Sequence, residues 1–199
     1  MERQRTDAWF NDRLGKVTAS NVHKVMSKGE KRTTYLYELL SERIEGKQDS
    51  FCSEYMQRGT DLEPEAKAAY SIETGIFIDE IGFVPHPTII NFGASPDGLI
   101  ESDGLIEIKC PKLNTHLKTI STDKIKPEYL YQMYTQMSCT GRVWCDFVSY
   151  YPNINNNLFI KRIIRDDEKI AEIEKAVILF LEELDELERK INEPNNSNR

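Results

Sequence analysis

The sequence has 199 residues, of which 39% are hydrophobic and 30% are charged, and its formal net charge at neutral pH is −7. This length and composition are typical of one globular domain with its own hydrophobic core. No apolar run reaches 18 residues and the N-terminal residues lack an apolar segment, so we expect neither a membrane span nor a secretory signal but a cytoplasmic protein. The four cysteines form no Cys-x-x-Cys pair, so a structural zinc site is not expected.

The negative charge is concentrated near the C-terminus. Residues 166–193 carry 11 acidic and 4 basic side chains, and the remaining residues are close to neutral. A bound metal would neutralise some of the other acids. The composition is therefore compatible with a basic groove for DNA.

Apolar periodicity and the placement of Gly and Pro predict helices and strands along the chain. The expected helices are Asp7–Leu14, a helix over 21–27 with Ser20 as its N-cap, Thr34–Ile44 ending at Gly46, Ser53–Thr74 ending at Gly75 with a kink or restart at Pro64, and Pro127–Thr140 ending at Gly141. The expected strands are Ile76–Val84, Ile89–Ala94, Gly98–Ile100, Gly104–Lys109, Trp144–Tyr151 and Leu158–Ile164. These elements predict an α/β fold with a central mixed sheet flanked by helices.

A last helix is expected over about residues 168–192, because its apolar residues recur every three or four positions. They are Ile170, Ile173, Val177, Phe180, Leu184, Leu187 and Ile191. Docking of this apolar seam on the chain's own sheet is favoured, since three heptads are short for an independent coiled coil, but a coiled coil with a partner stays open. Residues 194–199 are expected to form a disordered tail, so residues 1–193 would be a single domain.

The stretch over residues 95–111 places two acids and a lysine at the spacing Asp-x9-Glu-x-Lys. Residues 103–104, Asp-Gly, predict a hairpin turn because this dipeptide suits turn positions with positive φ. Glu107 and Lys109 then fall on one face of the following strand, so Asp97, Glu107 and Lys109 converge beside the turn. Carboxylate oxygens are the ligands that Mg²⁺ prefers, and a neighbouring ammonium orients water and stabilises charge at a phosphate. This set suits metal-assisted phosphodiester hydrolysis.

An acid-x-lysine pair on a strand is more often a solvated face with a weak ion pair. The preceding Ser-Pro-Asp-Gly favours the catalytic interpretation, because the order Pro-Asp…Glu-x-Lys is used by a large superfamily of nucleases. On these residues alone both interpretations stay open.

Several further groups of residues occur in a fixed order. They are Asp7-Ala8-Trp9 with Arg13-Leu14-Gly15 and Thr18-Ala19-Ser20, Gly59 with Glu63, Ser95-Pro96-Asp97-Gly98-Leu99, Glu107-Ile108-Lys109-Cys110-Pro111, and Tyr129-Leu130-Tyr131-Gln132. In this order and at these spacings the chain resembles the lambda exonuclease and YqaJ-like viral recombinase family, within the PD-(D/E)xK nuclease superfamily. The resemblance covers most of the chain and implies a restriction-endonuclease-like fold.

The resemblance implies a centre for Mg²⁺, expected as two ions with Mn²⁺ as a substitute. Asp97, Glu107 and the backbone carbonyl of Ile108 would be ligands, and Lys109 would position or activate the attacking water. Glu63 aligns with an acidic residue near the metals and is expected as a further ligand and catalytic residue. In such a site one ion activates water and the other stabilises the leaving oxygen.

By the same resemblance, Arg13, Ser20 and Ser95 align with residues that hold the 5′-phosphate of the cut strand. A guanidinium binds a terminal phosphate bidentately, hydroxyls donate to its remaining oxygens, and a helix start near Ser20 would add backbone N–H groups. Without the resemblance, a surface arginine and a plain N-cap serine would be the favoured interpretations.

The helix after the active-site strands departs from the family pattern, which often has Gln-x-Gln. Gln132 matches the first glutamine and is expected in the catalytic set, whereas Tyr134 replaces the second. Gln136 lies one helical turn from Gln132, so a shifted role for it is open.

The resemblance implies a Mg²⁺-dependent 5′→3′ exonuclease that digests double-stranded DNA from its ends to mononucleotides and leaves a 3′ single strand for phage-type recombination. It also implies a ring-shaped homotrimer and a phage-encoded single-strand annealing protein as partner. Two other functions stay open. One is an endonuclease of the same superfamily that cuts duplex or branched DNA internally, and the other is a non-catalytic scaffold that binds DNA ends.

Overall fold

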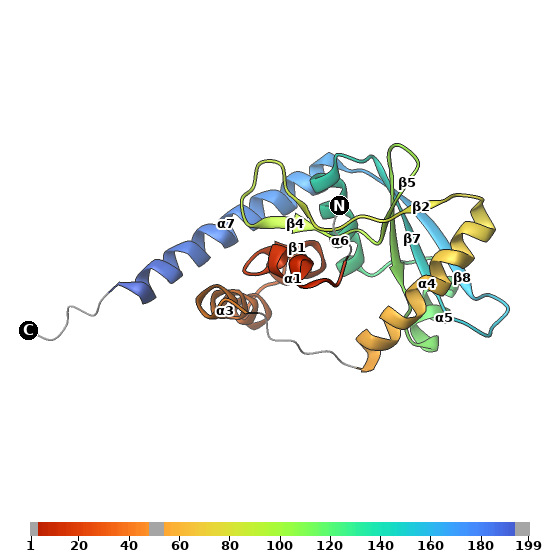
Figure 1. The fold of residues 1–199 in the computed structure, drawn as a ribbon, viewed down its shortest axis with the longest axis horizontal. Coiled ribbons are helices and arrows are strands. Elements are labelled where there is room, and N and C mark those ends of the chain that lie inside the picture. The colour runs from red at the N-terminus through yellow and green to blue at the C-terminus, as the bar shows by residue number, and fades with distance from the viewer. Residues whose placement is uncertain (1–3, 48–53, 194–199) are drawn as a thin grey trace, which may run out of the picture.

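The structure, a computed structural model, describes residues 4–47 and 54–193, so the predicted tail over 194–199 lies outside the described residues (Figure 1). The helices are α1 (Asp7–Arg13), the 3₁₀ helix η1 (Ala19–Asn21), α2 (Val22–Val25), α3 (Glu30–Glu45), α4 (Glu54–Thr74), α5 (Leu113–Thr122), α6 (Pro127–Thr140) and α7 (Asp167–Asn192). The strands are β1 (Val17–Thr18), β2 (Ile78–Asp79), β3 (Val84–Pro85), β4 (Phe92–Ala94), β5 (Gly98–Ile100), β6 (Gly104–Lys109), β7 (Trp144–Tyr150) and β8 (Leu158–Ile164). None of these helices is long and apolar enough to cross a membrane, within the part of the chain that the structure describes.

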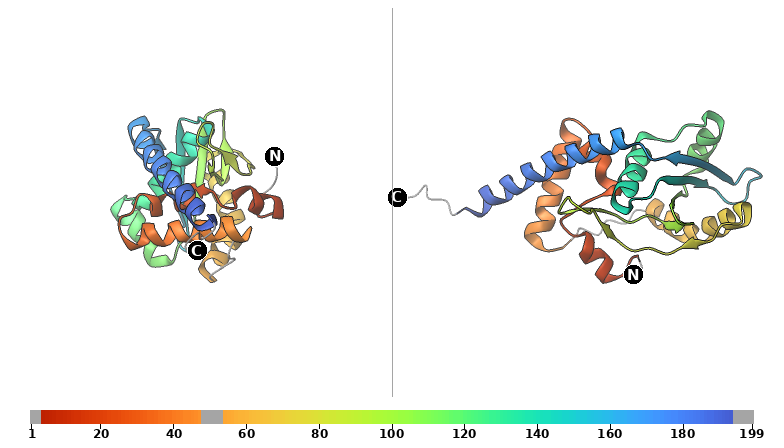
Figure 2. Two further views of the ribbon diagram at one scale, coloured as in Figure 1. Left: turned by 90° about the vertical axis from the view of Figure 1, so that its left-hand side faces the viewer. Right: turned by 90° about the horizontal axis from the view of Figure 1, so that it is seen from above.

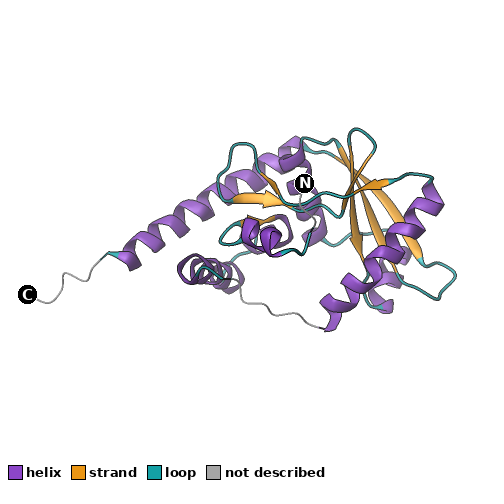
Figure 3. Cartoon of the chain, in the orientation of Figure 1, coloured by secondary structure: helices purple, strands orange, loops and turns teal. Residues whose placement is uncertain are grey.

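The larger sheet has five strands in the order β2-β5-β6-β7-β8. Its central pair, β6 and β7, is parallel, and the other neighbouring pairs are antiparallel. A smaller sheet has the order β1-β4-β3, with β1 parallel to β4. Helices lie on both sides of the larger sheet (Figures 1 and 3), so the predicted α/β fold with a central mixed sheet is confirmed.

Side chains alternate along β6 and enter two different hydrophobic layers. Ile106 and Ile108 pack in one cluster with Tyr70 of α4. Leu105 packs in another cluster with Met133 of α6. The predicted catalytic acid and lysine follow on the Leu105 face, so α6 covers them.

Most of the apolar seam of α7 is buried within the chain, although Ile191 at its end is exposed. Helices form most of the surface that the buried part contacts. Val177, Phe180 and Leu184 share a cluster with Tyr35 of α3, while Ile170 packs with the larger sheet. The expectation that the seam docks mainly on the sheet is therefore wrong, because α3 presents an apolar stripe of its own. Figure 2 shows the C-terminal end of α7 extending past α3.

Two predicted strands are much shorter in the structure. Within Ile76–Val84 only Ile78–Asp79 and Val84 belong to strands, because β2 pairs with β5 in the larger sheet and β3 pairs with β4 in the smaller one. The chain changes sheets between them. Within Ile89–Ala94 the strand begins at Phe92, since Asn91 adopts a left-handed φ of 61°.

Local details of the turns and caps also differ from the sequence predictions. Ser20 lies inside η1 and is not an N-cap, because α2 begins later, at Val22. The β5–β6 turn occupies residues 101–103, with the positive φ at Glu101, and Gly104 already belongs to β6. α4 runs through Pro64 without a restart, and α5 had not been predicted.

Two glycines give opposite expectations for substitution. A Cβ built on Gly104 would lie 2.2 Å from the Trp144 ring, whereas one built on Gly59, inside α4, meets nothing within 4 Å. Gly104→Ala should lower the free energy of unfolding by about 1–3 kcal/mol, because the ring must move. Gly59→Ala should raise it by about 0.5–1 kcal/mol, because alanine favours the helix. Urea denaturation measures both, and equal effects at the two positions would contradict this packing.

Candidate active site

Asp97 and Glu107 lie opposite each other on the β5–β6 hairpin. The register pairs Gly98 with Ile106, which places Asp97, the residue before β5, across from Glu107. Asp97 Oδ2 accepts a hydrogen bond of 2.6 Å from the backbone N–H of Ile108. The side chain of Glu107 is fully buried. The hairpin thus brings together two acids, of which Glu107 is fully buried and Asp97 is partly buried.

Lys109 lies on the same face of β6, and its ammonium forms an ion pair with Glu107 Oε1. The ammonium also donates a hydrogen bond of 3.3 Å to Gln132 Oε1 and lies 5.1 Å from the centroid of the Tyr129 ring. Burial alone would lower the pKa of Lys109, but the charges of Glu107 and Asp97 outweigh burial and raise that pKa. The side chain is therefore held as a positively charged donor.

When both are ionised, the two carboxylates carry more negative charge than the lysine neutralises. Burial, followed by the charge of Glu107, raises the pKa of Asp97 to about 8. Glu107 Oε1 is buried and accepts no hydrogen bond, although it contacts Lys109 as an ion pair. A divalent cation would supply the missing charge and a partner for this oxygen, and Mg²⁺ prefers such hard oxygen ligands. The residues present therefore fit a divalent cation.

Glu63 lies at the border of this centre. Its carboxylate forms ion pairs with Arg5 at 2.7 Å and with Lys67 at 2.9 Å. Its charge contributes to the raised pKa of Asp97. Among residues 4–47 and 54–193, no group of three or more His, Cys, Asp or Glu side chains is placed to hold a metal ion. The ligand role of Glu63 therefore stays a prediction.

A second cluster of polar side chains surrounds Ser95, which precedes Asp97 by two residues. Ser95 Oγ accepts hydrogen bonds from Trp9 Nε1 at 3.0 Å and from Arg13 Nη1 at 3.1 Å, and the guanidinium lies 4.2 Å from the centroid of the Trp9 ring. Burial lowers the pKa of Arg13 to about 10, which leaves it charged at neutral pH. The neighbouring Tyr35 and Glu42 act in the opposite direction and raise that pKa. A partly buried cation of this kind suits an anion.

Ser20 approaches the same region through the smaller sheet. Thr18 of β1 lies beside Gly93 of β4 in a parallel pair, so Ser20 and Ser95, each two residues later, leave the same end of that sheet. Ser20 is exposed, and its Oγ lies 3.2 Å from Thr18 Oγ1. No hydrogen bond joins Ser20 to Arg13 in the described part of the chain. Its role at a phosphate stays a prediction.

Helix α6 meets β6 through two glutamines. Gln132 accepts the hydrogen bond from Lys109, and Gln136 Nε2 donates one of 2.5 Å to Glu107 Oε2. Tyr134, between them, packs into the hydrophobic clusters that include α7. Sequence reasoning had left the role of Gln136 open, and the one-turn spacing from Gln132 was the signal for it.

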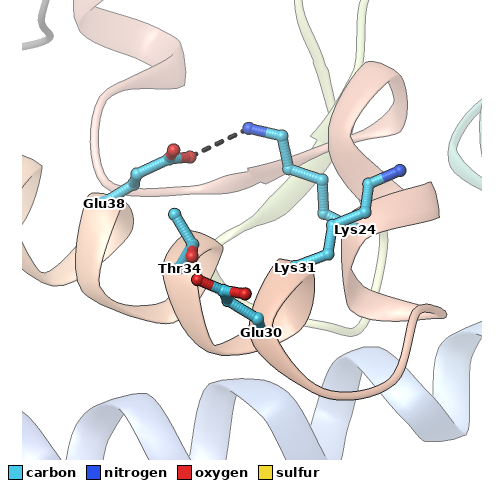
Figure 4. Close-up of a pocket in the computed structure, with 5 residues that line it drawn as sticks. All are labelled: Lys24, Glu30, Lys31, Thr34 and Glu38. Carbon is cyan, nitrogen blue, oxygen red and sulfur yellow. Dashed lines mark hydrogen bonds and ion pairs between the residues drawn. The ribbon is translucent and has the colours of Figure 1, made fainter.

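The described surface includes two hollows, which differ in how near they lie to the active-site strand. One of about 330 Å³ is lined by Lys24, Glu30, Lys31, Thr34 and Glu38 (Figure 4). It contains none of the predicted site residues. The other, of about 530 Å³, is lined by Gln57, Arg58, Asp61, Leu62, Tyr151 and Pro152. Arg58 donates hydrogen bonds to the carbonyls of Cys110 and Pro111, directly after Lys109, so this hollow borders the active-site strand.

Residues 8–143 match the YqaJ-like viral recombinase domain. The chain belongs to the YqaJ-like viral recombinase family. The family predicted from the separated motifs is thereby confirmed. A comparison with curated proteins gave no match.

Solved structures agree with this family membership. Two crystal structures of LHK-Exo, an alkaline exonuclease from Laribacter hongkongensis, are 54% identical to this chain, cover 94% of it and match over 96% of their own length. Their TM-scores are 0.91, for the complex with dAMP, and 0.90. A phage-related exonuclease from Haemophilus somnus 129PT has a TM-score of 0.72 at 16% identity, over 89% of this chain and 96% of that one, and supports the fold alone. The predicted restriction-endonuclease-like fold is confirmed.

Proposed function

We propose that this protein is a Mg²⁺-dependent exonuclease that degrades double-stranded DNA from its ends in the 5′→3′ direction and leaves a 3′ single strand for phage-type recombination. The observation that carries the proposal is the convergence of Asp97, Glu107 and Lys109 next to Arg13, a partly buried cation. Arg13 binds Ser95, only two residues before Asp97. A hydrolytic centre beside a site for a terminal phosphate suits an enzyme that acts on DNA ends.

The relatives support the same proposal. LHK-Exo is named an alkaline exonuclease, and its likeness extends over nearly the whole of both chains. Its complex with dAMP, a mononucleotide, agrees with an enzyme that releases mononucleotides. We extend this activity to the present chain because its acids and lysine are present in the same family motifs.

Asp97, Glu107 and the carbonyl of Ile108 would hold Mg²⁺, with Glu63 as a further ligand if two ions bind. Bound there, Mg²⁺ or its substitute Mn²⁺ supplies an activated water and stabilises charge on the leaving oxygen. The protein's contribution is to keep these oxygens together in a buried place. In the absence of a cation, burial and, after it, the charge of Glu107 raise the pKa of Asp97.

Lys109 acts at the phosphate and the attacking water. Its ammonium is held by Glu107 and by Gln132, so it points into the space beside the acids without leaving the strand face. In that position it orients water and stabilises negative charge. Gln132 gives the ammonium a second acceptor besides Glu107.

Arg13 and Ser95 would bind the 5′-phosphate of the strand being cut, with Ser20 as a third donor. The guanidinium lies over the Trp9 ring, 4.2 Å from its centroid, and would bind the phosphate through its N–H groups. A phosphate bound by Arg13 and Ser95 would lie close to the catalytic acids, because Asp97 is only two residues beyond Ser95 in the chain. This arrangement supports the proposal that digestion runs in the 5′→3′ direction.

A comparison of substrates tests the function. With Mg²⁺, the protein should release mononucleotides from the 5′ strands of linear duplex DNA and leave covalently closed duplex intact. Asp97→Asn should abolish the release without unfolding the protein. Cleavage of closed duplex would instead favour an endonuclease, and binding of ends without any hydrolysis would favour a scaffold.

Arg13→Ala tests the phosphate site. A charged bidentate contact contributes about 1.5–3 kcal/mol, or roughly ten- to a hundredfold, so the variant should lose most of the preference for 5′-phosphorylated over 5′-hydroxyl ends. The quantity to measure is the ratio of initial rates on the two substrates. Lys16→Ala, at a neighbouring cation, serves as control and should keep the ratio. An equal slowing of both substrates by Arg13→Ala would assign Arg13 to general DNA binding or folding.

We further propose that three copies form a ring around the duplex, that a single-strand annealing protein is the partner, and that the protein acts in the cytoplasm of the host cell. A ring explains sustained digestion, because release requires running off the end. Light scattering should give the mass of three chains. A stable monomer that digests DNA without dissociating from it would contradict the proposal of a ring.

A further inference from the structure

We infer that Gln136 positions the carboxylate of Glu107 for metal binding, an inference that rests on the metal centre proposed above. Gln136 is fully buried on α6, and its Nε2 donates a hydrogen bond of 2.5 Å to Glu107 Oε2. One turn earlier, Gln132 Oε1 accepts a hydrogen bond from Lys109. Two glutamines of one helix therefore hold the two residues of the Glu-x-Lys pair separately.

The spacing of helix and strand makes this double contact possible. Residues two apart on a strand are about 6.6–6.8 Å apart along it, and four residues of a helix rise about 6 Å. α6 crosses β6 with Gln132 at Lys109 and Gln136 at Glu107, so the two run in opposite directions there. A Gln-x-Gln pair would not match in this way, because helix residues two apart do not face the same side. Tyr134 accordingly packs elsewhere.

The hydrogen bond from Gln136 gives the two oxygens of Glu107 different partners. Oε2 is occupied by the amide, while Oε1 accepts no hydrogen bond and contacts only the ammonium of Lys109 as an ion pair among the described residues. A fixed Oε2 prevents rotation of the carboxylate and holds Oε1 in one orientation. Hydrogen-bond partners that orient a ligand in this way strengthen metal binding.

A purely structural role explains the side chain less well. The other amide atom of Gln136, Oε1, is buried without a hydrogen-bond partner in the described structure. An unpaired buried acceptor lowers stability, and an apolar residue of similar size would avoid that cost. The advantage of glutamine here therefore lies in its donor to Glu107.

Binding of Mn²⁺ to the metal-free protein, followed by electron paramagnetic resonance, tests the inference without any measurement of activity. Gln136→Met keeps the size and removes the donor, and it should weaken Mn²⁺ binding about 10- to 100-fold. Ser138→Ala is the matched control, because it removes hydrogen bonds of Ser138, on the same helix, to Glu174 at 2.5 Å and to His86 at 2.9 Å, away from Asp97 and Glu107. It should leave the Mn²⁺ affinity unchanged, even where its melting temperature falls.

Wild-type Mn²⁺ affinity in folded Gln136→Met would overturn the inference, and so would an equal loss of affinity in Ser138→Ala. If Gln136→Met does not fold, Gln136→Asn, whose shorter side chain also loses the contact, carries the same expectation and the same refutation. Asp97→Asn separates the two proposals. It should abolish Mn²⁺ binding, and unchanged binding would show that the metal centre itself is wrong.

Discussion

Glu107 is a carboxylate with no exposure to solvent near the centre of a β-sheet, and the surrounding elements supply what such a group requires. An ionised carboxylate away from water is costly unless it is paired and hydrogen-bonded. Lys109 supplies the opposite charge and Gln136 supplies the hydrogen bond. Asp97 lies beside it as a second acid, with a raised pKa. The parallel β6–β7 pair needs cover on both faces. α4 covers one face, and α6 covers the other and carries both glutamines.

Another buried acid in the same sheet shows how the chain satisfies a carboxylate with a structural role. Asp146 on β7 accepts a hydrogen bond of 2.8 Å from Tyr70 and two, of 2.8 and 2.9 Å, from Arg162. Both of its oxygens are thereby occupied by groups of the protein. Glu107 has an oxygen with no hydrogen bond, and Asp97 has a raised pKa. The contrast between complete and incomplete pairing separates a structural acid from acids suited to a ligand.

Local sequence patterns predicted the parts of the site that depend on neighbouring residues. The alternation along β6 correctly placed Glu107 and Lys109 on one face, and Pro127 and Gly141 marked where α6 begins and ends. These features are set by strand period and by the backbone preferences of Pro and Gly. The end of the predicted strand Trp144–Tyr151 shifted by a single residue.

Contacts between distant segments were beyond local patterns. The hydrogen bond between Arg13 and Ser95 joins residues 82 positions apart, and nothing near either residue indicates the other. The apolar seam of α7 could have packed on any of several apolar surfaces of the chain, and its periodicity does not say which. In the structure it packs on α3. The expected cap at Ser20 failed for a related reason, since pairing of β1 with β4 shapes the backbone there. The family motifs, and not periodicity, predicted that Arg13, Ser20 and Ser95 belong to one site.

The central claim is that Asp97 and Glu107 share a catalytic metal ion. The most direct test is a crystal of the wild-type protein soaked in Mn²⁺, with anomalous scattering recorded at the manganese edge. We expect a peak between the carboxylates of Asp97 and Glu107, close to the carbonyl of Ile108. A peak elsewhere, or none, in crystals of a protein that degrades DNA with Mn²⁺ in solution would contradict it.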